Sequence, residues 1–359
     1  MREIKIENKL IGNKHPIFTI AEIGSNHNRS KKTVFKLIDS CKDAGFDAVK
    51  FQIYDAEEAF SKNVTTKDVN LHHFYGLKPW WQIAKNKILM PRDWFGEMFD
   101  YVRKKKLIPL SAIHREEDLV FLKNFGLSAI KIASIDLNYF QLHKKLIKYK
   151  LPTIISTGMG SIKEIKKVFN FYKKRNHNKI ILLHCNSNYP PKNKNVNLKN
   201  IKFLKKKFDC LTGFSDHTFD NYCAFGSVSL GAKVIEKHIT LNKKYPGPDH
   251  PFAIEPNEMK NFIYGIRKIE ECLGSEKRIL SKDELISKKM IRRSIVANNF
   301  IKKNKKITEQ DIKYARPGNG FATYQSNQVI GKKASKNIKP ETIISKSMLT
   351  NVNYSKKFR

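Results

Sequence analysis

The sequence predicts an α/β protein in which a (β/α)8 barrel is followed by a small β-rich domain. Between residue 17 and about residue 275, short apolar runs alternate eight times with longer amphipathic stretches. This alternation is typical of a parallel (β/α)8 barrel. After Gly274 the pattern changes to short β-rich pieces. The chain has 359 residues, which is long enough for one large domain and one small one.

Eight apolar runs are the candidate strands of the barrel, because strands buried on both faces are apolar nearly throughout. They are residues 17–24, 47–53, 107–113, 129–134, 153–158, 179–185, 211–217 and 234–240. The amphipathic stretches include a predicted helix at residues 31–45. Another is predicted after the eighth strand, at residues 257–274.

Three segments are expected along the chain. The barrel would span residues 1–280, a linker residues 281–292, and the small domain residues 293–359. The stretch SEKRILSKDELISKK is interpreted as the linker or a helical bridge. A domain of this size has little core of its own, so we expect it to dock on the barrel or on a partner subunit.

The net charge of +36 comes from 69 basic and 33 acidic residues, and it raises the question of nucleic-acid binding. The basic residues are mostly lysines spread along the chain, as in KKLIKYK and KFLKKKF, where they mix with apolar residues at helical spacing. There is no aromatic stacking motif or zinc finger. We therefore expect a lysine-rich solvated surface and no nucleic-acid partner, with a positive field that favours anionic substrates.

The location of the protein is predicted from three absences in its sequence. No apolar run approaches the roughly 20 residues that a membrane span needs. The N-terminal stretch lacks the apolar core of a signal peptide. The five cysteines are scattered and form no CxxC pair, which indicates reduced thiols. The expectation is a cytoplasmic protein without a membrane partner.

Polar residues lie at or near the end of every candidate strand, where barrels of this kind carry their chemistry. A single serine or threonine there is more often a cap or a satisfied hydrogen-bonding group. Buried lysines, histidines and carboxylates on eight strands together favour a site, because each is costly to bury without a partner. In strand order they are Glu22, Asn26, His27; Lys50, Gln52; Ser111, His114; Lys131, Ser134, Asp136; Ser156, Thr157; His184, Tyr189; Ser215, Asp216, His217; and Glu236, Lys237, His238.

The residue types suggest two kinds of chemistry. Lys50 and Lys131 lie within apolar strands, where a lysine either forms an imine with a carbonyl substrate or binds an anion. Serines at three strand ends favour a phosphate, and a Schiff-base aldolase is the alternative. His217 and His238 end adjacent strands and could share a divalent metal, unless both are structural groups. Glu22 is a third metal partner or a general base.

Several motifs resemble those of the N-acetylneuraminate (sialic acid) synthase family, which includes the legionaminic and pseudaminic acid synthases. The matching pieces are FTIAEIGSNHN, AGFDAVKFQ, AIKIAS, IISTGM, LLHCNSNYP, GFSDHT, VIEKHITL and PGPDHPFAIEP. RRSIVA and ARPGNG resemble the antifreeze-like (SAF) domain at the C-terminus of that family. The resemblance covers nearly the whole chain, and GFSDHT and VIEKHITLNKKYPGPDH are its most specific parts.

The resemblance implies a barrel joined to a small β-rich SAF domain of the β-clip type. It also implies a domain-swapped homodimer in which that domain covers the active site of the partner. The implied reaction condenses phosphoenolpyruvate with an open-chain amino sugar resembling N-acetylmannosamine, and it releases phosphate and a nonulosonic (sialic-type) acid. The alternatives are a phosphoenolpyruvate- or sugar-binding protein with a degenerate barrel, and another carbohydrate enzyme of the aldolase type.

The resemblance also assigns roles to residues. His217 and His238 would hold a divalent metal, with Mn²⁺ expected first and Mg²⁺ or Co²⁺ as alternatives, and together with Glu22 they would form the catalytic set. The phosphoenolpyruvate site would comprise Lys50, Lys131, Ser134, Ser156 and Ser215. The sugar would contact Gln52, Tyr189 and Asp249, as well as Glu22, and Arg316 from the other subunit.

The chain departs from the family pattern at two places near the predicted phosphate site. After the third strand it has SAIH where the family usually has STPF, so Ala112 lacks a hydroxyl expected near the phosphate. After the fourth strand it has KIASID where the family commonly has KIPSGE or KIASGE, so Asp136 is one methylene shorter than the usual glutamate. His114 is a candidate to replace part of what Ala112 lacks.

Overall fold

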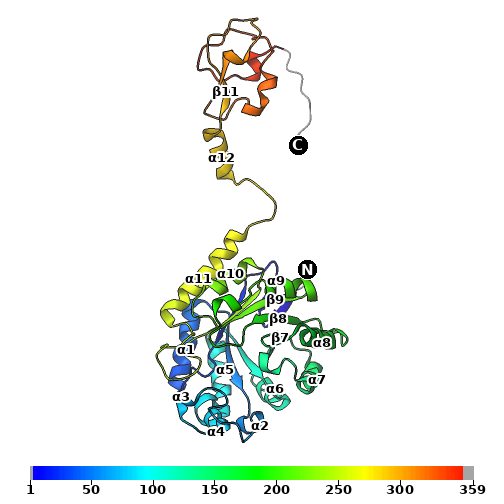
Figure 1. Ribbon diagram of the computed structural model, residues 1–359, viewed down its shortest axis with the longest axis vertical. Helices are drawn as coiled ribbons and strands as arrows, with labels where there is room; N and C mark the ends of the chain where they lie inside the picture. Colours follow the sequence, from blue (N-terminus) through cyan, green and yellow to red (C-terminus); the bar gives the residue numbers. More distant parts are fainter. Residues whose placement is uncertain (1–2, 351–359) are drawn as a thin grey trace. The chain divides into compact units, whose positions relative to one another are not determined.

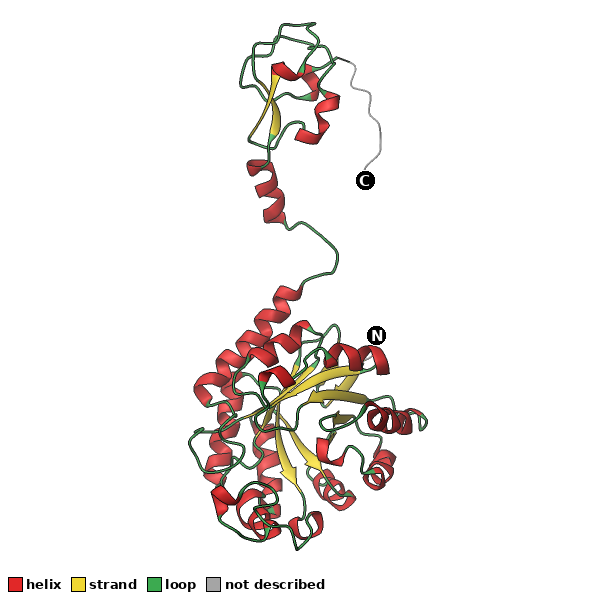
Figure 2. Cartoon of the chain, in the orientation of Figure 1, coloured by secondary structure: helices red, strands yellow, loops and turns green. Residues whose placement is uncertain are grey.

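The computed structural model describes residues 3–350, and the chain divides into two compact units, residues 1–274 and 275–359. The first unit is a closed barrel of eight parallel strands (Figure 1, Figure 2). Its strands are β3 (Phe18–Glu22), β4 (Ala48–Ile53), β5 (Ile108–Ile113), β6 (Ile130–Ile132), β7 (Thr153–Ser156), β8 (Ile180–Cys185), β9 (Leu211–Asp216) and β10 (Val234–His238). Each strand pairs with its neighbour along the chain, and β10 pairs with β3 to close the ring. The predicted fold class is confirmed.

A helix follows each barrel strand and packs on the outside of the ring (Figure 2). These helices are α1 (Lys31–Ala44), α5 (Phe95–Lys104), α6 (Glu116–Lys123), α7 (Phe140–Leu146), α8 (Ile162–Lys173), α9 (Asn200–Phe208), α10 (Tyr222–Ser229) and α11 (Pro256–Leu273). Helix α1 shows why the predicted boundaries agree with the structure. Ser30 caps its N-terminus, and Gly45, with φ of 89°, ends it in the left-handed conformation that glycine adopts readily.

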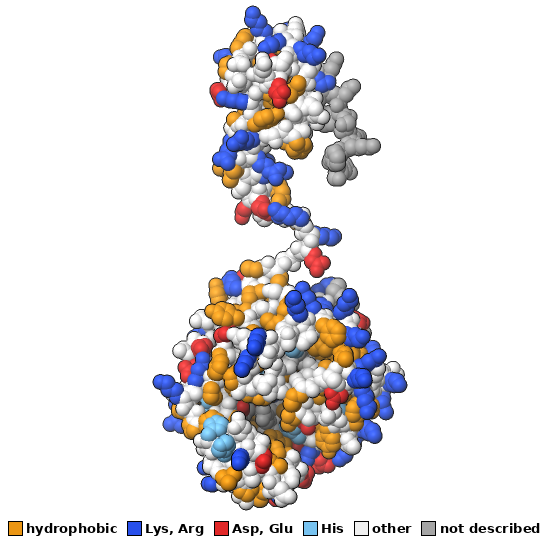
Figure 3. Space-filling view, viewed as in Figure 1, with side chains coloured by type: hydrophobic (Ala, Val, Ile, Leu, Met, Phe, Trp, Pro, Cys, Tyr) orange, Lys and Arg blue, Asp and Glu red, His pale blue; other side chains and the backbone are white. Residues whose placement is uncertain are grey.

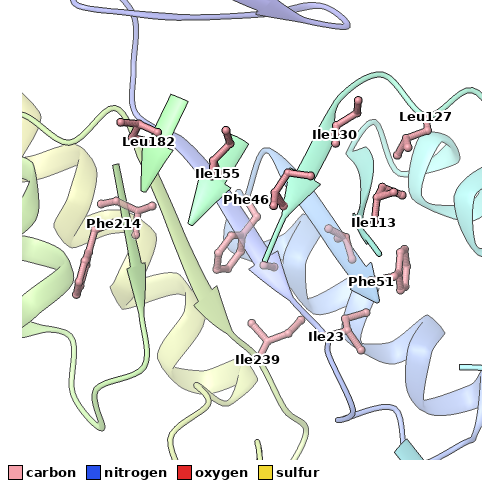
Figure 4. Close-up of a cluster of buried hydrophobic side chains, with 14 of the residues drawn as sticks. Ile23, Phe46, Phe51, Ile113, Leu127, Ile130, Ile155, Leu182, Phe214 and Ile239 are labelled. Carbon is pink, nitrogen blue, oxygen red and sulfur yellow. The ribbon is translucent and has the colours of Figure 1, made fainter. Parts of the chain in front are cut away.

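Alternation along each strand separates two hydrophobic layers. Side chains that face outward, such as Phe51, Ile113, Ile155, Leu182 and Phe214, pack in the layer between the strands and the helices (Figure 4). Side chains of the opposite parity fill the inside of the barrel. These are Phe18, Ile20, Ala48, Ile108, Leu110, Ala129, Ile154, Ile181, Leu183, Leu211 and Val234. In most strands, the last one or two inward-facing residues lie on the C-terminal side of this apolar filling.

An antiparallel hairpin closes one end of the barrel. It consists of β1 (Glu3–Ile6) and β2 (Lys9–Gly12). Ile4, Ile6 and Ile11 are buried and belong to the same cluster as the apolar residues inside the barrel. The barrel residues of this cluster come mainly from the N-terminal parts of the strands, so the hairpin covers that end. This hairpin was not predicted from the sequence.

The connection from β4 to α5 is the longest in the barrel. It contains three short helices, α2 (Ala56–Ala59), α3 (His72–Tyr75) and α4 (Trp80–Ile83), followed by a π-helical turn at Ala84–Ile88. Trp80 and other buried residues form a small core of their own, against which Tyr54 and Phe60 pack. The connection is therefore a packed substructure beside the end of β4.

The second unit has its own hydrophobic core and short β elements. Helix α12 (Lys282–Ile291) precedes the antiparallel pair β11 (Ser294–Ala297) and β12 (Ile312–Ala315). The core includes Ile295, Ile301, Ile307, Val329, Ile338 and Ile344. Short bridges such as Ile301–Ile338 connect its loops. The small β-rich domain that the sequence predicted is therefore present.

The surface carries the excess of basic residues. Lysine and arginine side chains are dispersed over the visible face of the barrel unit among apolar and uncharged ones (Figure 3). In residues 3–350 no helix combines the length and the apolar character that a membrane span requires.

Candidate active site

A cavity of about 840 Å³ opens at the C-terminal ends of the barrel strands. Its volume is in the range of sites that bind small molecules. The strand residues that line it are Lys50, Gln52, Ala112, Lys131, Ser156, Cys185, Ser215, Glu236 and His238. The loops after the strands add Ser134, His114, Asp136, Tyr189, His217 and Asp249. This is the end of the barrel at which the sequence predicted a site.

The twofold alternation of the strands decides which polar residues face the cavity. On β10, Glu236 and His238 line the cavity, while the intervening Lys237 points away and pairs with Asp216, at 2.9 Å. His184 on β8 also points away, and its Nε2 donates to the carbonyl of Val196 at 2.6 Å. The strand-end polar residues therefore fall into two sets, and only the inward set can contact a ligand.

A buried network of charged groups forms the floor of the cavity. Lys50 Nζ lies 3.1 Å from Glu22 Oε2 and 3.1 Å from Glu236 Oε1. Lys131 Nζ lies 3.8 Å from Glu236 Oε1 and donates to Ser156 Oγ at 2.7 Å. The network therefore joins β3, β4, β6, β7 and β10 at one level of the barrel.

The two carboxylates of the network differ in charge state. Burial alone would raise the pKa of Glu236, but the ammonium groups of Lys131 and Lys50 outweigh it and lower the pKa to about 2. Burial raises the pKa of Glu22 to about 7, in spite of Lys50. Near neutral pH, one full carboxylate and one partly protonated carboxyl group therefore face two lysines. The resulting excess of positive charge suits an anionic ligand.

Burial also acts on the two lysines. It lowers the pKa of Lys131, where Glu236 only partly offsets it. Burial would lower the pKa of Lys50 as well, but Glu22 and Glu236 together raise it. Lys50 therefore holds its proton more firmly than Lys131 does.

Glu22 lies beneath the cavity rather than in its wall. Its side chain has no exposed surface and it is not a lining residue. Gln52 Nε2 donates to Glu22 Oε1 at 2.7 Å, and Gln52 itself lines the cavity. Glu22 therefore influences a ligand in this conformation through Gln52 and Lys50.

Three serine hydroxyls line the cavity together with Lys131. Ser156 accepts the lysine's hydrogen bond, and Ser215 Oγ donates to Glu236 Oε1 at 3.0 Å. Ser134 Oγ accepts from the backbone N–H of Gly158 at 3.0 Å. Lysine ammonium groups and hydroxyls are donors that bind phosphate oxygens by charge-assisted hydrogen bonds.

His217 and His238 lie next to each other in the cavity wall, with ring centroids 5.3 Å apart. His217 Nδ1 donates to the carbonyl of Asn186 at 2.9 Å, which leaves its Nε2 available to a ligand. His238 Nδ1 is buried and has no hydrogen-bond partner in the described part of the chain. The pKa of both histidines is lowered to about 3, mainly by burial, and His238 acts in the same direction on His217, as Lys50 does on His238. Both rings are therefore neutral, which is the form that binds metals.

The surroundings of the two histidines fit a divalent metal. Gly24 has φ of 52°, and a Cβ there would lie 3.0 Å from Asp249 Oδ2 and 3.3 Å from His238 Cε1. Glycine thus leaves open the space beside the ring. Within residues 3–350, no cluster of three or more His, Cys, Asp and Glu side chains is arranged to hold a metal. The two neutral imidazoles are a donor set that an open metal site could use, with water and substrate oxygens as the other ligands.

The structure brings most of the predicted site residues together at one end of the barrel. These are Glu22, Lys50, Gln52, Lys131, Ser134, Ser156, Tyr189, Ser215, His217, His238 and Asp249. Tyr189 packs against His217 with ring centroids 4.3 Å apart. Asp249 Oδ2 accepts from Ser25 Oγ at 2.8 Å and lies 3.9 Å from His238 Nδ1. Arg316 belongs to the second compact unit, residues 275–359.

Glu236 was given no role in the prediction, although it contacts Lys50, Lys131 and Ser215. Its parity is the signal that could have found it, because it lies two residues before His238 on the same strand. Cys185, which also faces the cavity, could have been found in the same way.

Comparison with known proteins gives two family matches. The model of the NeuB family matches residues 37–278, and the model of the SAF domain matches residues 292–350. The NeuB match lies in the first compact unit except for its last four residues, 275–278, which belong to the second. The SAF match lies entirely in the second unit.

Similar proteins include two curated relatives and a solved structure. The chain is 33% identical over 332 residues to the pseudaminic acid synthase of Campylobacter jejuni, covering 90% of this chain and 94% of the relative. It is 32% identical over 337 residues to the N,N'-diacetyllegionaminic acid synthase of Legionella pneumophila, covering 93% and 94%. The crystal structure of the N-acetylneuraminic acid (sialic acid) synthetase of Leptospira borgpetersenii is 30% identical, with a TM-score of 0.71 over 80% of this chain and 95% of that one.

Proposed function

This chain belongs to the NeuB family, and from that premise we propose that it is a nonulosonic acid synthase. It condenses phosphoenolpyruvate with an open-chain amino sugar resembling N-acetylmannosamine, and it releases phosphate. One observation carries the proposal. On one side of a single cavity, two lysines face one fully charged carboxylate, so positive charge is in excess. On the other side of the same cavity lie two neutral histidines.

Phosphoenolpyruvate occupies the part of the cavity around Lys131. Lys50 and Lys131 supply positive charge, and three hydroxyls supply hydrogen bonds, from Ser134, Ser156 and Ser215. The lysines are held in place by Glu236 before any ligand binds. Preorganised donors of this kind stabilise charge without having to reorient during the reaction.

His217 and His238 would hold the divalent metal, for which Mn²⁺ is the first candidate and Mg²⁺ and Co²⁺ are the alternatives. When bound, the metal supplies Lewis-acid polarisation of the sugar's aldehyde oxygen. The protein's contribution is to keep both imidazoles neutral by burial and to fix the His217 ring through Asn186.

The reaction forms a carbon–carbon bond and breaks a carbon–oxygen bond. The C2–C3 double-bond electrons of phosphoenolpyruvate attack the aldehyde carbon, which leaves a cationic C2. Water adds to C2 and loses a proton, which balances the proton that the former aldehyde oxygen takes up to become a hydroxyl. Phosphate then leaves with cleavage of the C2–O bond, as the new C2 hydroxyl loses its proton and becomes the ketone. Glu236 and Glu22 lie under this centre and stabilise the cation, while Gln52 holds the partly protonated Glu22 in place by a hydrogen bond.

The amino sugar lies toward the cavity mouth, against Gln52, Tyr189 and Asp249. Arg316 contacts its N-acyl end from the second copy of a domain-swapped homodimer. Exposed apolar side chains on the segments that follow the barrel strands support a covered face: Ile135, Tyr139, Met159, Phe219 and, at the start of α10, Tyr222. The five cysteines are all free, which supports a reducing, cytoplasmic location.

The direct test is phosphate release from purified protein. We expect release only when phosphoenolpyruvate, a 2-acetamido sugar and a divalent metal are all present. EDTA abolishes it, and His217→Ala or His238→Ala lowers kcat by at least about a hundredfold because metal affinity is lost. His184→Ala is the matched control, since His184 ends a barrel strand but points away from the cavity.

The outcomes separate this function from its alternatives. Folded protein that binds phosphoenolpyruvate but releases no phosphate with any of several amino sugars and metals is a binding protein with a degenerate barrel. Turnover that survives EDTA and is trapped by borohydride at Lys50 or Lys131 identifies a Schiff-base aldolase instead. Mass detection of the product identifies the sugar.

A further inference from the structure

The cavity wall has one gap in its ring of functional groups. Among the described strand residues that line the cavity, Ala112 on β5 is the one with an alkyl side chain. Its neighbours across the sheet are Gln52 on β4 and Lys131 on β6. Strand β5 therefore places no polar side-chain atom beside Lys131.

His114 lies above this gap. It is two residues beyond Ala112, so it has the same parity, and it also lines the cavity. Its Nδ1 lies 2.6 Å from Asp136 Oδ2, and its ring meets that of Tyr54 edge to face at 5.2 Å. The ring is thus fixed by a hydrogen bond and a packing contact. Its other nitrogen, Nε2, makes no hydrogen bond within residues 3–350.

Asp136 places the pair on the phosphate side of the cavity. It ends a single 3₁₀ turn, Ser134–Asp136, so one short element positions both the Ser134 hydroxyl and the carboxylate that holds His114. This turn follows β6, the strand of Lys131. The metal-site residues, His217 and His238, come instead from the ends of β9 and β10.

We propose that His114 binds the phosphate of phosphoenolpyruvate through Nε2–H and that Asp136 is its positioning residue. Strand β5 then contributes a phosphate donor by way of the imidazole, in place of a side-chain donor at Ala112. With Nδ1 held by the Asp136 carboxylate, Nε2–H can donate to a phosphate oxygen, and a hydrogen bond to an anionic acceptor is charge-assisted. This inference rests on the proposed function, because it assigns the phosphate of that reaction to one corner of the cavity.

The first test compares the two substrates. In His114→Ala, we expect KM for phosphoenolpyruvate and the inhibition constant of inorganic phosphate to rise by a similar factor, roughly 10- to 100-fold for one charge-assisted hydrogen bond. KM for the amino sugar should change less than about threefold. A rise in KM for the sugar with unchanged constants for phosphoenolpyruvate and phosphate would overturn the proposal.

Two amide variants identify the nitrogen that acts. Glutamine can place its amide nitrogen near the position of Nε2, whereas asparagine reaches only as far as Nδ1. We therefore expect H114Q to retain more of the phosphoenolpyruvate affinity than H114N. In D136N the ring loses its anionic partner, so the constants for phosphoenolpyruvate and phosphate rise while that for the sugar does not. Equal loss in H114Q and H114N would contradict a direct contact through Nε2.

A rescue experiment tests the gap itself. Adding A112T to H114A supplies a hydroxyl from β5, and we expect it to lower KM for phosphoenolpyruvate back toward the wild-type value. H15A is the matched control, because His15 Nε2 also contacts a carboxylate, Glu3 Oε1 at 2.9 Å, but just after the hairpin at the closed end of the barrel. Its kinetic constants should equal those of the wild type.

Direct binding keeps this inference separate from the proposed function. If wild-type protein shows no turnover, the proposed function fails, but calorimetric titration with phosphoenolpyruvate still compares wild type, H114A and H15A. If wild type turns over normally and H114A binds phosphoenolpyruvate as tightly as wild type, only the assignment of His114 fails. Thermal unfolding of each variant verifies that the comparison is between folded proteins.

Discussion

Glu22 shows how burial gives a single side chain a function in the pH range of the cell. It has no exposed surface, and its position below Lys50 and Gln52 removes it from water without removing it from the network. Its pKa of about 7, against an ordinary value of 4.5, means that its charge changes near neutral pH. Neighbouring Glu236 stays ionised, because two lysines hold its pKa near 2.

Glu22→Gln should change the pH dependence of stability. Between pH 4.5 and about 7 the folded chain holds a proton on Glu22 that the unfolded chain has released. The wild type therefore loses stability as pH rises through this window, by at most about 3 kcal/mol. The variant lacks this loss. The unfolding free energy of the wild type minus that of the variant should therefore become smaller from pH 4.5 to pH 7. Urea unfolding at a series of pH values measures it.

Glu276→Gln, which changes an exposed carboxylate, is the control for this comparison. Its unfolding free energy should differ from that of the wild type by the same amount at every pH. Parallel curves for Glu22→Gln as well would show that Glu22 titrates in the fold as it does in the unfolded chain.

At the residue scale, the sequence predicts where polar groups gather but not which of them cooperate. Polar strand ends were enough to locate Lys50, Lys131, His217 and His238 at one end of the barrel. Parity could also have separated Glu236 from Lys237. The pairing of His114 with Asp136 could not be predicted, because it joins two loops whose paths depend on packing.

At the scale of elements, the loop between β9 and α10 is fastened to the outside of the barrel wall. Lys237 Nζ pairs with Asp216 Oδ2 and donates to the carbonyl of Thr218 at 2.6 Å. Thr218 Oγ1 in turn donates to Asp216 Oδ1 at 2.7 Å. Neither member of the ion pair is exposed, and His217 lies between Asp216 and Thr218 in the chain. The pair thus fixes the backbone that carries His217, one of the two histidines of the proposed metal site.

Lys237→Met should destabilise the fold by roughly 3–5 kcal/mol, because it leaves Asp216 buried without its cation. The double variant Asp216→Leu with Lys237→Met should recover a large part of this loss, since replacing both charges avoids the unpaired group. Urea unfolding measures both.

Lys243→Met is the matched control for that comparison. Lys243 pairs with Glu258 at 2.7 Å, but both side chains are about one-third exposed. Such a pair contributes at most about 1 kcal/mol. A loss no larger in Lys237→Met than in Lys243→Met would mean that water or a neighbour satisfies Asp216.

The barrel elements could be predicted because strands buried on both faces form continuous apolar runs, and all eight predicted runs contain a strand. The β1–β2 hairpin was missed because each strand has only four residues and part of each is exposed. The short helices of the connection after β4 were missed for a related reason. They are held by their own small core rather than by a long amphipathic pattern.

For the whole molecule, the sequence predicts two units of unequal size, and the structure divides the chain near Gly274. Periodicity alone does not say what the second unit covers. The proposed domain swap comes from the family resemblance, and it gives each active site a barrel from one chain and Arg316 from the other.

Mixing two inactive variants tests this assembly. Arg316→Ala and His217→Ala should each be inactive or nearly so. Refolding or co-expressing them together should restore phosphate release to about a quarter of the wild-type level. This follows because half of the dimers are mixed and each mixed dimer has one intact site. Restoration is measured against each variant alone.

An arrangement without swapping gives a different result. Each chain would then combine its own barrel with its own Arg316, no mixed dimer would contain an intact site, and activity would stay at the level of the separate variants. Size-exclusion chromatography at the assay concentration shows whether dimers form.

The β1–β2 hairpin covers the N-terminal end of the barrel and, together with the apolar side chains that fill its inside, closes that side to reactants. With that end filled by Ile4, Ile6 and Ile11, molecules enter and leave at the opposite face. Phosphoenolpyruvate at the level of Lys131 then lies deeper than the sugar near Tyr189 and Asp249, and a bound sugar obstructs its path. Entry by one route imposes a sequence on binding, with the deeper reactant first and the outer one second.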